Sequence, residues 1–137
     1  MTIVLDASLT VATVVMEHRT AEAQAAMIHV GERPIWVPSL WRLEVANVLR
    51  TLVRKGVVTP GFVDTSLNDL ARVSIAVDPH TDALAWTEIL TLSREEELTV
   101  YGTAYLELAL RLGATLLTLD MKLANAARRR GVEVLPG

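Results

Sequence analysis

Short apolar runs alternate along this chain with longer segments that have the periodicity of amphipathic helices. Most of the short runs are continuously apolar, which is typical of strands in a parallel sheet with both faces covered. This alternation predicts an α/β fold with a parallel five-stranded sheet and helices on both faces. The predicted strands are Ile3–Leu5, Ile35–Val37, Ser74–Val77, Thr115–Leu119 and Val132–Leu135.

Capping residues, proline and glycine mark the helix boundaries. Thr59 followed by Pro60 predicts an N-cap with proline at the first helical position, and Thr20 is a second predicted N-cap. The predicted helices are Ser8–Met16, Ala21–Val30, Leu40–Lys55, Pro60–Leu70, Asp82–Arg94, Thr103–Leu112 and Met121–Arg130, and four of them end at Gly31, Gly56, Gly113 and Gly131. Because no repeat or linker separates these elements, residues 1–137 are expected to form one domain.

Composition and charge exclude several classes of protein. With 51% hydrophobic and 21% charged residues, the chain has too much apolar material for a disordered protein. A net charge of −3 excludes a global positive field that would collect nucleic acid. The absence of cysteine removes disulfides, thiolate nucleophiles and Cys-ligated zinc. Carboxylates are therefore the expected chemical groups, and the cytoplasm is the expected compartment.

The first residues do not have the pattern of a targeting segment. Asp6 interrupts the first apolar run, and no basic region precedes it. No window of the sequence reaches the ~18 continuous apolar residues of a membrane-spanning helix. The protein is expected to begin at Met1, to be soluble and to have no membrane partner.

Two of the predicted strands run into an aspartate. Ile3–Leu5 is followed by Asp6, and Thr115–Leu119 is followed by Asp120. In open α/β sheets the ligand site lies beyond the carboxyl ends of the strands, where the strand order reverses. If these two strands are neighbours, their carboxylates meet at the mouth of one cleft.

A third acidic residue, Glu44, lies in the longest predicted helix. Its neighbours are mostly apolar, while Asn47 and Thr51 continue a narrow polar stripe along the helix. We therefore expect Glu44 to face a polar cleft. The residues expected to enter the core from this helix are Val45, Val48, Leu49 and Leu52.

Four segments of the chain, taken in order, resemble a PIN domain of the VapC toxin type. They are Val4-Leu5-Asp6-Ala7-Ser8, then Leu43-Glu44-Val45-Ala46-Asn47-Val48-Leu49, then Leu98-Thr99-Val100-Tyr101 before Tyr105-Leu106-Glu107-Leu108-Ala109, and finally Thr118-Leu119-Asp120 with Leu123-Ala124. The resemblance covers essentially the whole chain. It implies a metal-dependent endoribonuclease in which four acidic residues hold one or two Mg²⁺ or Mn²⁺ ions that cut RNA. It also implies a cognate antitoxin that wraps a dimeric toxin.

The resemblance assigns three of the four acidic positions. Asp6, Glu44 and Asp120 take metal-binding positions, with Ser8 and Thr118 as supporting hydroxyl groups. At the fourth position, directly after Leu-Thr-Val-Tyr, the family has aspartate and this chain has Gly102. Glycine supplies no side-chain oxygen, so the resemblance implies an endoribonuclease toxin that is inactive or weakened as written. Either the site is naturally degenerate, or the residue was changed to silence a toxic nuclease.

The sequence is also compatible with two other functions. A non-catalytic module could keep the recognition of antitoxin or RNA on the same fold. A phosphoacceptor receiver domain also uses carboxylates at strand ends, but it expects paired acids where Ala7 follows Asp6.

Individual residues also have purely structural interpretations. Asp6 and Asp120 could be N-caps, and Glu44 could form an ordinary ion pair. Glu107 could replace the missing carboxylate, although Arg111 four residues later favours a helix-surface pair. Arg128-Arg129-Arg130 could contact RNA or simply complement the end of a helix.

The longest predicted helix also suggests self-association. The apolar residues between Leu40 and Val53 occupy more than one face of that helix. A helix that is apolar on several sides needs additional burial, so we expect a homodimer.

Overall fold

The computed structural model describes residues 1–15 and 21–137. The predicted N-cap at Thr20 and the predicted helix end at Met16 lie outside the described residues. Within them, five parallel strands form one sheet, as predicted. The order of the strands in that sheet is β3-β2-β1-β4-β5. The strands are β1 (Ile3–Leu5), β2 (Ile35–Val37), β3 (Ile75–Val77), β4 (Thr115–Leu117) and β5 (Val134–Leu135).

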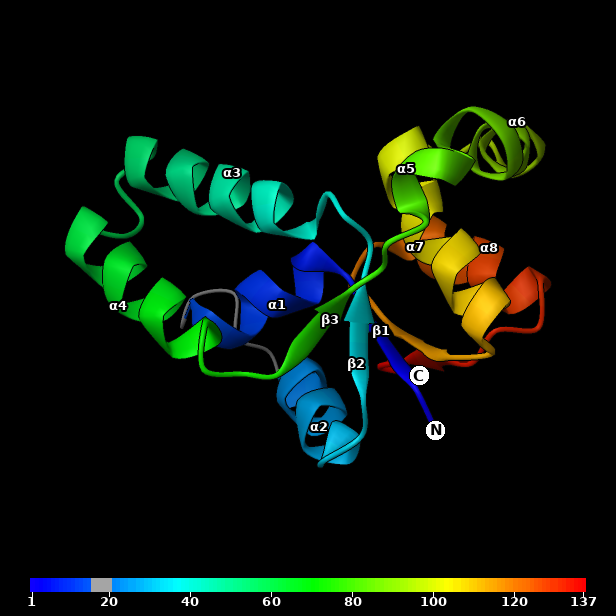
Figure 1. The fold of residues 1–137 in the computed structure, drawn as a ribbon. Coiled ribbons are helices and arrows are strands. Elements are labelled where there is room, and N and C mark those ends of the chain that lie inside the picture. Colours follow the sequence, from blue (N-terminus) through cyan, green and yellow to red (C-terminus); the bar gives the residue numbers. More distant parts are fainter. Residues whose placement is uncertain (16–20) are drawn as a thin grey trace.

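Helices cover the sheet. They are α1 (Ala7–Val14), α2 (Ala21–Val30), α3 (Trp41–Arg54), α4 (Pro60–Leu70), α5 (Thr81–Leu84), η2 (Ala85–Ile89), α6 (Leu90–Glu96), α7 (Val100–Leu112) and α8 (Met121–Arg129). In Figure 1, α1, α3 and α4 lie on the left of the sheet, α2 lies below it, and α5 to α8 lie on the right. No helix in the described part of the chain is long and apolar enough to cross a membrane.

Several predicted boundaries were wrong for identifiable reasons. The predicted helix Asp82–Arg94 is three successive helical pieces, α5, the π-helical η2 and α6. Helix α7 begins at Val100 instead of Thr103, because Thr99 accepts the Gly102 N–H and acts as the N-cap. Strand β4 ends two residues before Leu119, and the Thr118 hydroxyl group accepts the Asp120 N–H in the turn that follows.

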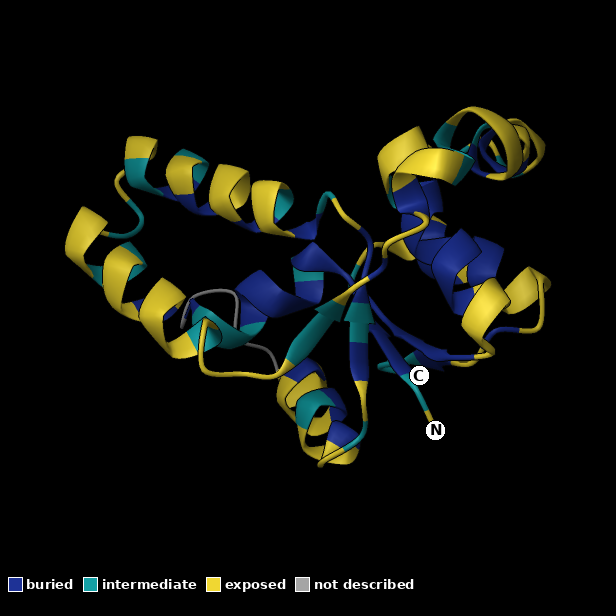
Figure 2. Cartoon of the chain, viewed as in Figure 1, coloured by how far each residue is buried: buried dark blue, intermediate teal, exposed yellow. Residues whose placement is uncertain are grey.

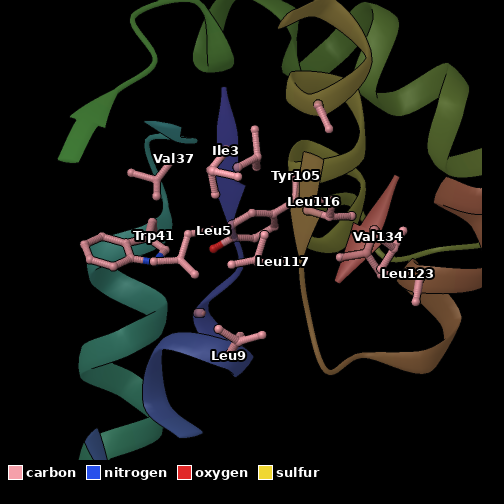
Figure 3. Close-up of a cluster of buried hydrophobic side chains, with 14 of the residues drawn as sticks. Ile3, Leu5, Leu9, Val37, Trp41, Tyr105, Leu116, Leu117, Leu123 and Val134 are labelled. Atoms are coloured by element: carbon pink, nitrogen blue, oxygen red, sulfur yellow. The ribbon is translucent and has the colours of Figure 1, made fainter. Parts of the chain in front are cut away.

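The core lies on both sides of the two central strands. Ile3, Val4, Leu116 and Leu117 are fully buried. Tyr105 from α7 lies beside Leu5, Leu116 and Leu117 in Figure 3. Figure 2 shows this buried region around β1 and α7. Edge strand β3 differs, because its residue Val77 is 42% exposed and helices do not cover both of its faces. The expectation of full cover therefore holds for the centre of the sheet and is wrong at this edge.

The strand order reverses between β1 and β4. The chain passes from β1 to β2 to β3 on one side, and then returns to place β4 on the other side of β1. The two strands pair in parallel with Leu5 opposite Leu117, and the Asp6 N–H donates to the Leu117 carbonyl at 2.9 Å. Their carboxyl ends therefore meet at the topological switch point, where ligands bind in folds of this kind.

A largely buried ion network ties β3 to α7. Arg111 donates to both oxygens of Asp78, at 3.1 and 2.7 Å, and to both oxygens of Glu107, at 2.8 and 3.0 Å. The Asp78 side chain is 2% exposed and the Glu107 side chain 10%. Burial raises the pKa of Asp78, but hydrogen bonds from Arg111 and Thr81 outweigh it, so the pKa lies below its ordinary value.

Replacing Arg111 by Met should destabilise the protein by about 3 kcal/mol, because Asp78 would be left charged, buried and without its main partner. Since the folded-state pKa of Asp78 is lowered, its contribution to stability is present above the pKa of the unfolded chain and is lost at lower pH. The difference in unfolding free energy between the two forms should therefore shrink below about pH 4. Denaturant titration at several pH values measures this.

Arg129→Met is the control for this experiment. Arg129 pairs with Glu96 at 2.8 Å, and its own side chain is 58% exposed. Loss of such an exposed pair should cost much less stability than loss of the Asp78 network. Equal losses for the two variants would contradict the assigned role of the Asp78 network.

Candidate active site at the carboxyl ends of β1 and β4

Asp6 is the buried carboxylate at the centre of the site. It directly follows β1 and is 7% exposed. Its Oδ2 accepts hydrogen bonds from the hydroxyl groups of Ser8, at 2.7 Å, and Thr118, at 2.6 Å. The side chain makes no capping bond to α1, although Asp6 occupies the N-cap position. Its hydroxyl partners are Ser8 and Thr118, the two residues that the sequence resemblance put forward.

Asp120 reaches the site from the loop after β4. It lies three residues beyond the strand, so the prediction that the strand runs directly into it was wrong. The loop is fixed by two bonds, because Thr118 accepts the Asp120 N–H at 3.0 Å and Ser8 accepts the Leu119 N–H at 3.1 Å. Asp120 Oδ1 also accepts the Leu123 N–H at 3.2 Å and caps α8. This carboxylate therefore has a capping role and a free second oxygen that no described residue bonds.

Glu44 projects from the first turn of α3 and is half-buried. Its Oε1 accepts a hydrogen bond from the Tyr105 hydroxyl group at 2.5 Å. Tyr105 is fully buried among labelled core side chains in Figure 3. Tyr105 was not among the site residues predicted from the sequence. Its position three residues after Gly102 on a predicted helix was the available signal, since such residues share a helix face.

Val48 was expected in the core beneath Glu44, and this was wrong. It is 37% exposed, whereas Val45, Leu49 and Leu52 are buried. The buried stripe of α3 follows positions 41, 45, 49 and 52, and position 48 falls to the side of that stripe.

The three acidic residues share one electrostatic neighbourhood. Burial raises the pKa of Asp6 more than its two hydroxyl partners lower it, and the charge of Asp120 raises it further. Burial likewise raises the pKa of Glu44 more than the Tyr105 hydroxyl lowers it, and the charge of Asp6 adds to the effect. Partly buried carboxylates that repel one another are characteristic of a functional site, and a cation there would relieve the repulsion.

Gly102 lies at the start of α7, as predicted. It is the third helical residue after the N-cap Thr99, and its N–H donates to the Thr99 hydroxyl at 3.1 Å. It shares a helix face with Tyr105, the partner of Glu44. A side chain at position 102 would therefore begin one helical turn from the Tyr105–Glu44 pair.

The carboxylates of the candidate site are the kind of ligand that a hard cation prefers, but too few of them lie together to hold one. Carboxylate oxygens are the ligands that Mg²⁺ prefers. Among residues 1–15 and 21–137, however, no three His, Cys, Asp or Glu side chains gather closely enough to hold a metal ion. Gly102, where the resemblance expects an aspartate, lies in the first turn of α7 and adds no side-chain oxygen.

Replacing Tyr105 by Phe should raise the pKa of Glu44 further, because the hydroxyl group that lowers it is removed. We expect the change to cost about 1 kcal/mol of stability through the lost hydrogen bond. Carbon-detected NMR titration of the Glu44 carboxyl group measures the pKa. Tyr101→Phe is the control, since Tyr101 is 67% exposed and its hydroxyl group bonds to no described residue. An unchanged Glu44 titration in Tyr105→Phe would contradict the positioning role.

Two proteins of known family match most of this chain. Ribonuclease VapC3 of Pyrobaculum aerophilum is 33% identical over 125 residues, which cover 91% of this chain and 94% of the relative. Ribonuclease VapC3 of Mycobacterium tuberculosis is 31% identical over 127 residues, which cover 90% of this chain and 86% of the relative. This chain belongs to the VapC family of PIN-domain ribonucleases. No protein-family model matches it.

Solved structures agree with the VapC fold. PAE2754 from P. aerophilum superposes with a TM-score of 0.71 at 24% identity, over 98% of this chain and 83% of that one. VapBC2 from Rickettsia felis, solved with a DNA fragment from its promoter, gives a TM-score of 0.60 at 16% identity, over 98% and 97% of the two chains.

Other charged residues considered in this VapC chain have structural partners. Glu107 pairs with Arg111, as expected, but it is buried inside the Asp78 network instead of lying on the surface. Arg129 and Arg130 pair with Glu96 and Glu95 at 2.6–2.8 Å. Arg128 donates to the Pro136 carbonyl at 3.3 Å. These pairs reduce the positive charge that the arginine run offers to RNA.

Proposed function

We propose that this chain is the endoribonuclease toxin of a type II toxin–antitoxin pair and that its activity depends on Mg²⁺ or Mn²⁺. In this proposal, Gly102 impairs the activity because it replaces an aspartate of the metal site. Two observations support the proposal: β1 and β4 pair in parallel, which places Asp6 at the switch point, and the charge of Asp120 acts on Asp6 while the charge of Asp6 acts on Glu44. Two relatives of similar length are named ribonucleases.

Each carboxylate has a protein group that orients it. Ser8 and Thr118 hold one oxygen of Asp6, the buried Tyr105 holds one oxygen of Glu44, and the start of α8 holds one oxygen of Asp120. Groups held in this way keep their geometry without reorganisation when a substrate arrives. A bound divalent ion would supply stabilisation of the attacking and leaving oxygens of the phosphodiester.

The substitution at position 102 supports the proposal of impairment. Mg²⁺ keeps several waters and takes few protein ligands, so each carboxylate contributes a large share of the site. Glycine contributes none. Returning a carboxylate to position 102 tests the proposal, with cleavage of RNA in the presence and absence of EDTA as the measurement.

The second candidate is a non-catalytic module that retains recognition of antitoxin or RNA. The specific observation in its favour is that the described residues gather no three-ligand group at the site. Metal-dependent cleavage of RNA by the chain as written would exclude it. The expected partner under both proposals is a cognate antitoxin, since one structural neighbour is a VapBC pair. A cysteine-free chain acting on cellular RNA fits the cytoplasm.

Self-association is part of the same proposal. Leu43, at 76% exposure, and Val48, at 37%, point away from the core on α3. We expect a homodimer at micromolar concentration in sedimentation, with Leu43→Glu shifting it toward monomer. Ile28→Glu is the control, because Ile28 is 80% exposed on α2. A monomer before any substitution would refute the dimer.

A further inference from the structure

A small cavity of about 160 Å³ opens beside the acidic site. It lies between the loop before α3, the pieces α5 and η2, and the first turns of α7. Its walls include Ser39, Thr81, Asp82, Ile89, Tyr101 and Ala104. None of these residues holds the three acidic side chains, so the cavity is a separate feature of the molecule.

Its position connects it to the candidate active site. Tyr101 and Ala104 lie on either side of Gly102 in α7, and Tyr105 is the next residue. Leu40 also lines the cavity, and its carbonyl accepts the Glu44 N–H at 3.0 Å. The cavity is therefore about one helical turn from both position 102 and Glu44.

The walls combine a flat exposed ring with an apolar interior. Tyr101 is 67% exposed, and its hydroxyl group bonds to no residue in the described ranges. Ile89, at 1% exposure, and Ala104, at 4%, form the buried apolar side. An exposed aromatic ring beside a small apolar cavity offers a stacking surface for one planar group.

On the polar side of the cavity, one carboxylate oxygen of Asp82 is available to accept a hydrogen bond from a ligand. Asp82 Oδ1 accepts the Ser39 hydroxyl at 2.6 Å, whereas Oδ2 receives no hydrogen bond from any described residue. The Thr81 hydroxyl is already used, because it donates to Asp78 at 2.8 Å and accepts the Ser39 N–H at 3.4 Å. A ligand therefore meets a carboxylate that accepts hydrogen bonds and cannot donate them.

We propose that this cavity binds one unpaired base of single-stranded RNA, stacked on Tyr101, with an exocyclic amino group donating to Asp82. This inference rests on the proposed ribonuclease function and adds a specificity site to it. Adenine, cytosine and guanine carry such an amino group. Uracil presents carbonyl oxygens on both sides of its only ring N–H, and these would face the carboxylate. The site should therefore discriminate against uridine.

The test uses binding, so it does not depend on cleavage. Fluorescence anisotropy in EDTA measures the affinity of the chain as written for labelled oligouridine hexamers with adenosine, cytidine, guanosine or uridine at one central position. We expect at least one amino-bearing base to bind about tenfold more tightly than uridine. Tyr101→Ala should weaken binding of that oligonucleotide about tenfold, while Tyr101→Phe should keep it. Asp82→Asn should remove the preference over uridine.

Asp64→Asn is the matched control, because Asp64 is exposed on α4 and the substitution removes the same charge. It should leave the base preference unchanged. Equal affinities for all four oligonucleotides, or an identical preference in Asp82→Asn, would overturn the base site. Either result would leave the cleavage test at position 102 intact, so the failure of this inference is distinguishable from failure of the ribonuclease proposal.

Discussion

Gly102→Asp should increase Mg²⁺- or Mn²⁺-dependent cleavage of RNA by at least about a hundredfold over the chain as written. The new carboxylate would start one helical turn from the Glu44–Tyr105 pair and would complete the set of oxygen donors. The positive end of the α7 dipole and the free N–H groups of its first turn favour the charged form there. The expected gain is therefore in metal binding and in cleavage together.

The substitution should be tolerated by the fold. A Cβ at position 102 would lie 3.3 Å from the Thr99 hydroxyl, so that side chain must shift by a few tenths of an ångström. Against this, removal of glycine from a helix gains about 0.5–1 kcal/mol. An acidic residue three positions after a threonine cap is also favourable at a helix start. A lack of activity could not then be blamed on unfolding.

Two variants at the same position separate charge from shape. Gly102→Asn matches the size of aspartate without its charge, and Gly102→Ala reports the effect of a Cβ alone. Only the Asp form should show EDTA-sensitive cleavage of a mixed cellular RNA. The impaired-nuclease proposal fails if Gly102→Asp folds but neither binds Mn²⁺ more tightly nor cleaves any RNA that the Gly102 form does not cleave. The binding-module proposal would then replace it.

Asp6→Asn should abolish the restored activity while making the protein more stable. In the Gly102→Asp background we expect cleavage to fall by about a hundredfold or more, because the central carboxylate is lost. In the chain as written, the melting temperature at neutral pH should rise by about 3 °C. Burial disfavours the charge of Asp6, and asparagine offers the Ser8 and Thr118 hydroxyl groups an uncharged acceptor in its place.

The direction of this change in stability follows from the pKa of Asp6. The folded-state pKa of Asp6 is raised above the ordinary 3.8, so between these two values the folded protein holds more protons than the unfolded chain. Stability therefore falls as the pH rises through that window and stays reduced above it. Asp6→Asn should remove this decline. Asp64→Asn, on the exposed surface of α4, should leave it unchanged. A lower melting temperature for Asp6→Asn at neutral pH would contradict the argument.

The order of the strands could not be read from the sequence. Apolar runs predicted each strand to within two residues at every end, because a buried strand must be continuously apolar. They did not indicate that β4 returns to the side of β1, since that pairing joins Ile3 to Thr115 across most of the chain. The meeting of Asp6 and Asp120 depends on this long-range pairing.

Local signals determined the helix ends where a single residue has a strong preference. Thr59 and Pro60 started α4 as predicted, and Gly56, Gly113 and Gly131 take the left-handed conformation expected after a helix. The π-helical turn at η2 had no such signal. It lies where η2 and α6 pack against α7, and periodicity along one segment does not contain that information.

The sequence by itself determined the fold class and the family, because the strand and helix patterns and the order of the motifs depend on residue type and local spacing. The acidic site residues and the consequence of Gly102 stay predictions that the resemblance implies. Only the tertiary structure decided which side chains donate hydrogen bonds to these carboxylates. Tyr105 is sixty-one positions from Glu44, and Thr118 is one hundred and twelve from Asp6. Burial raises the pKa of Asp6 and of Glu44 through surroundings brought from several elements, and no local pattern specifies those surroundings.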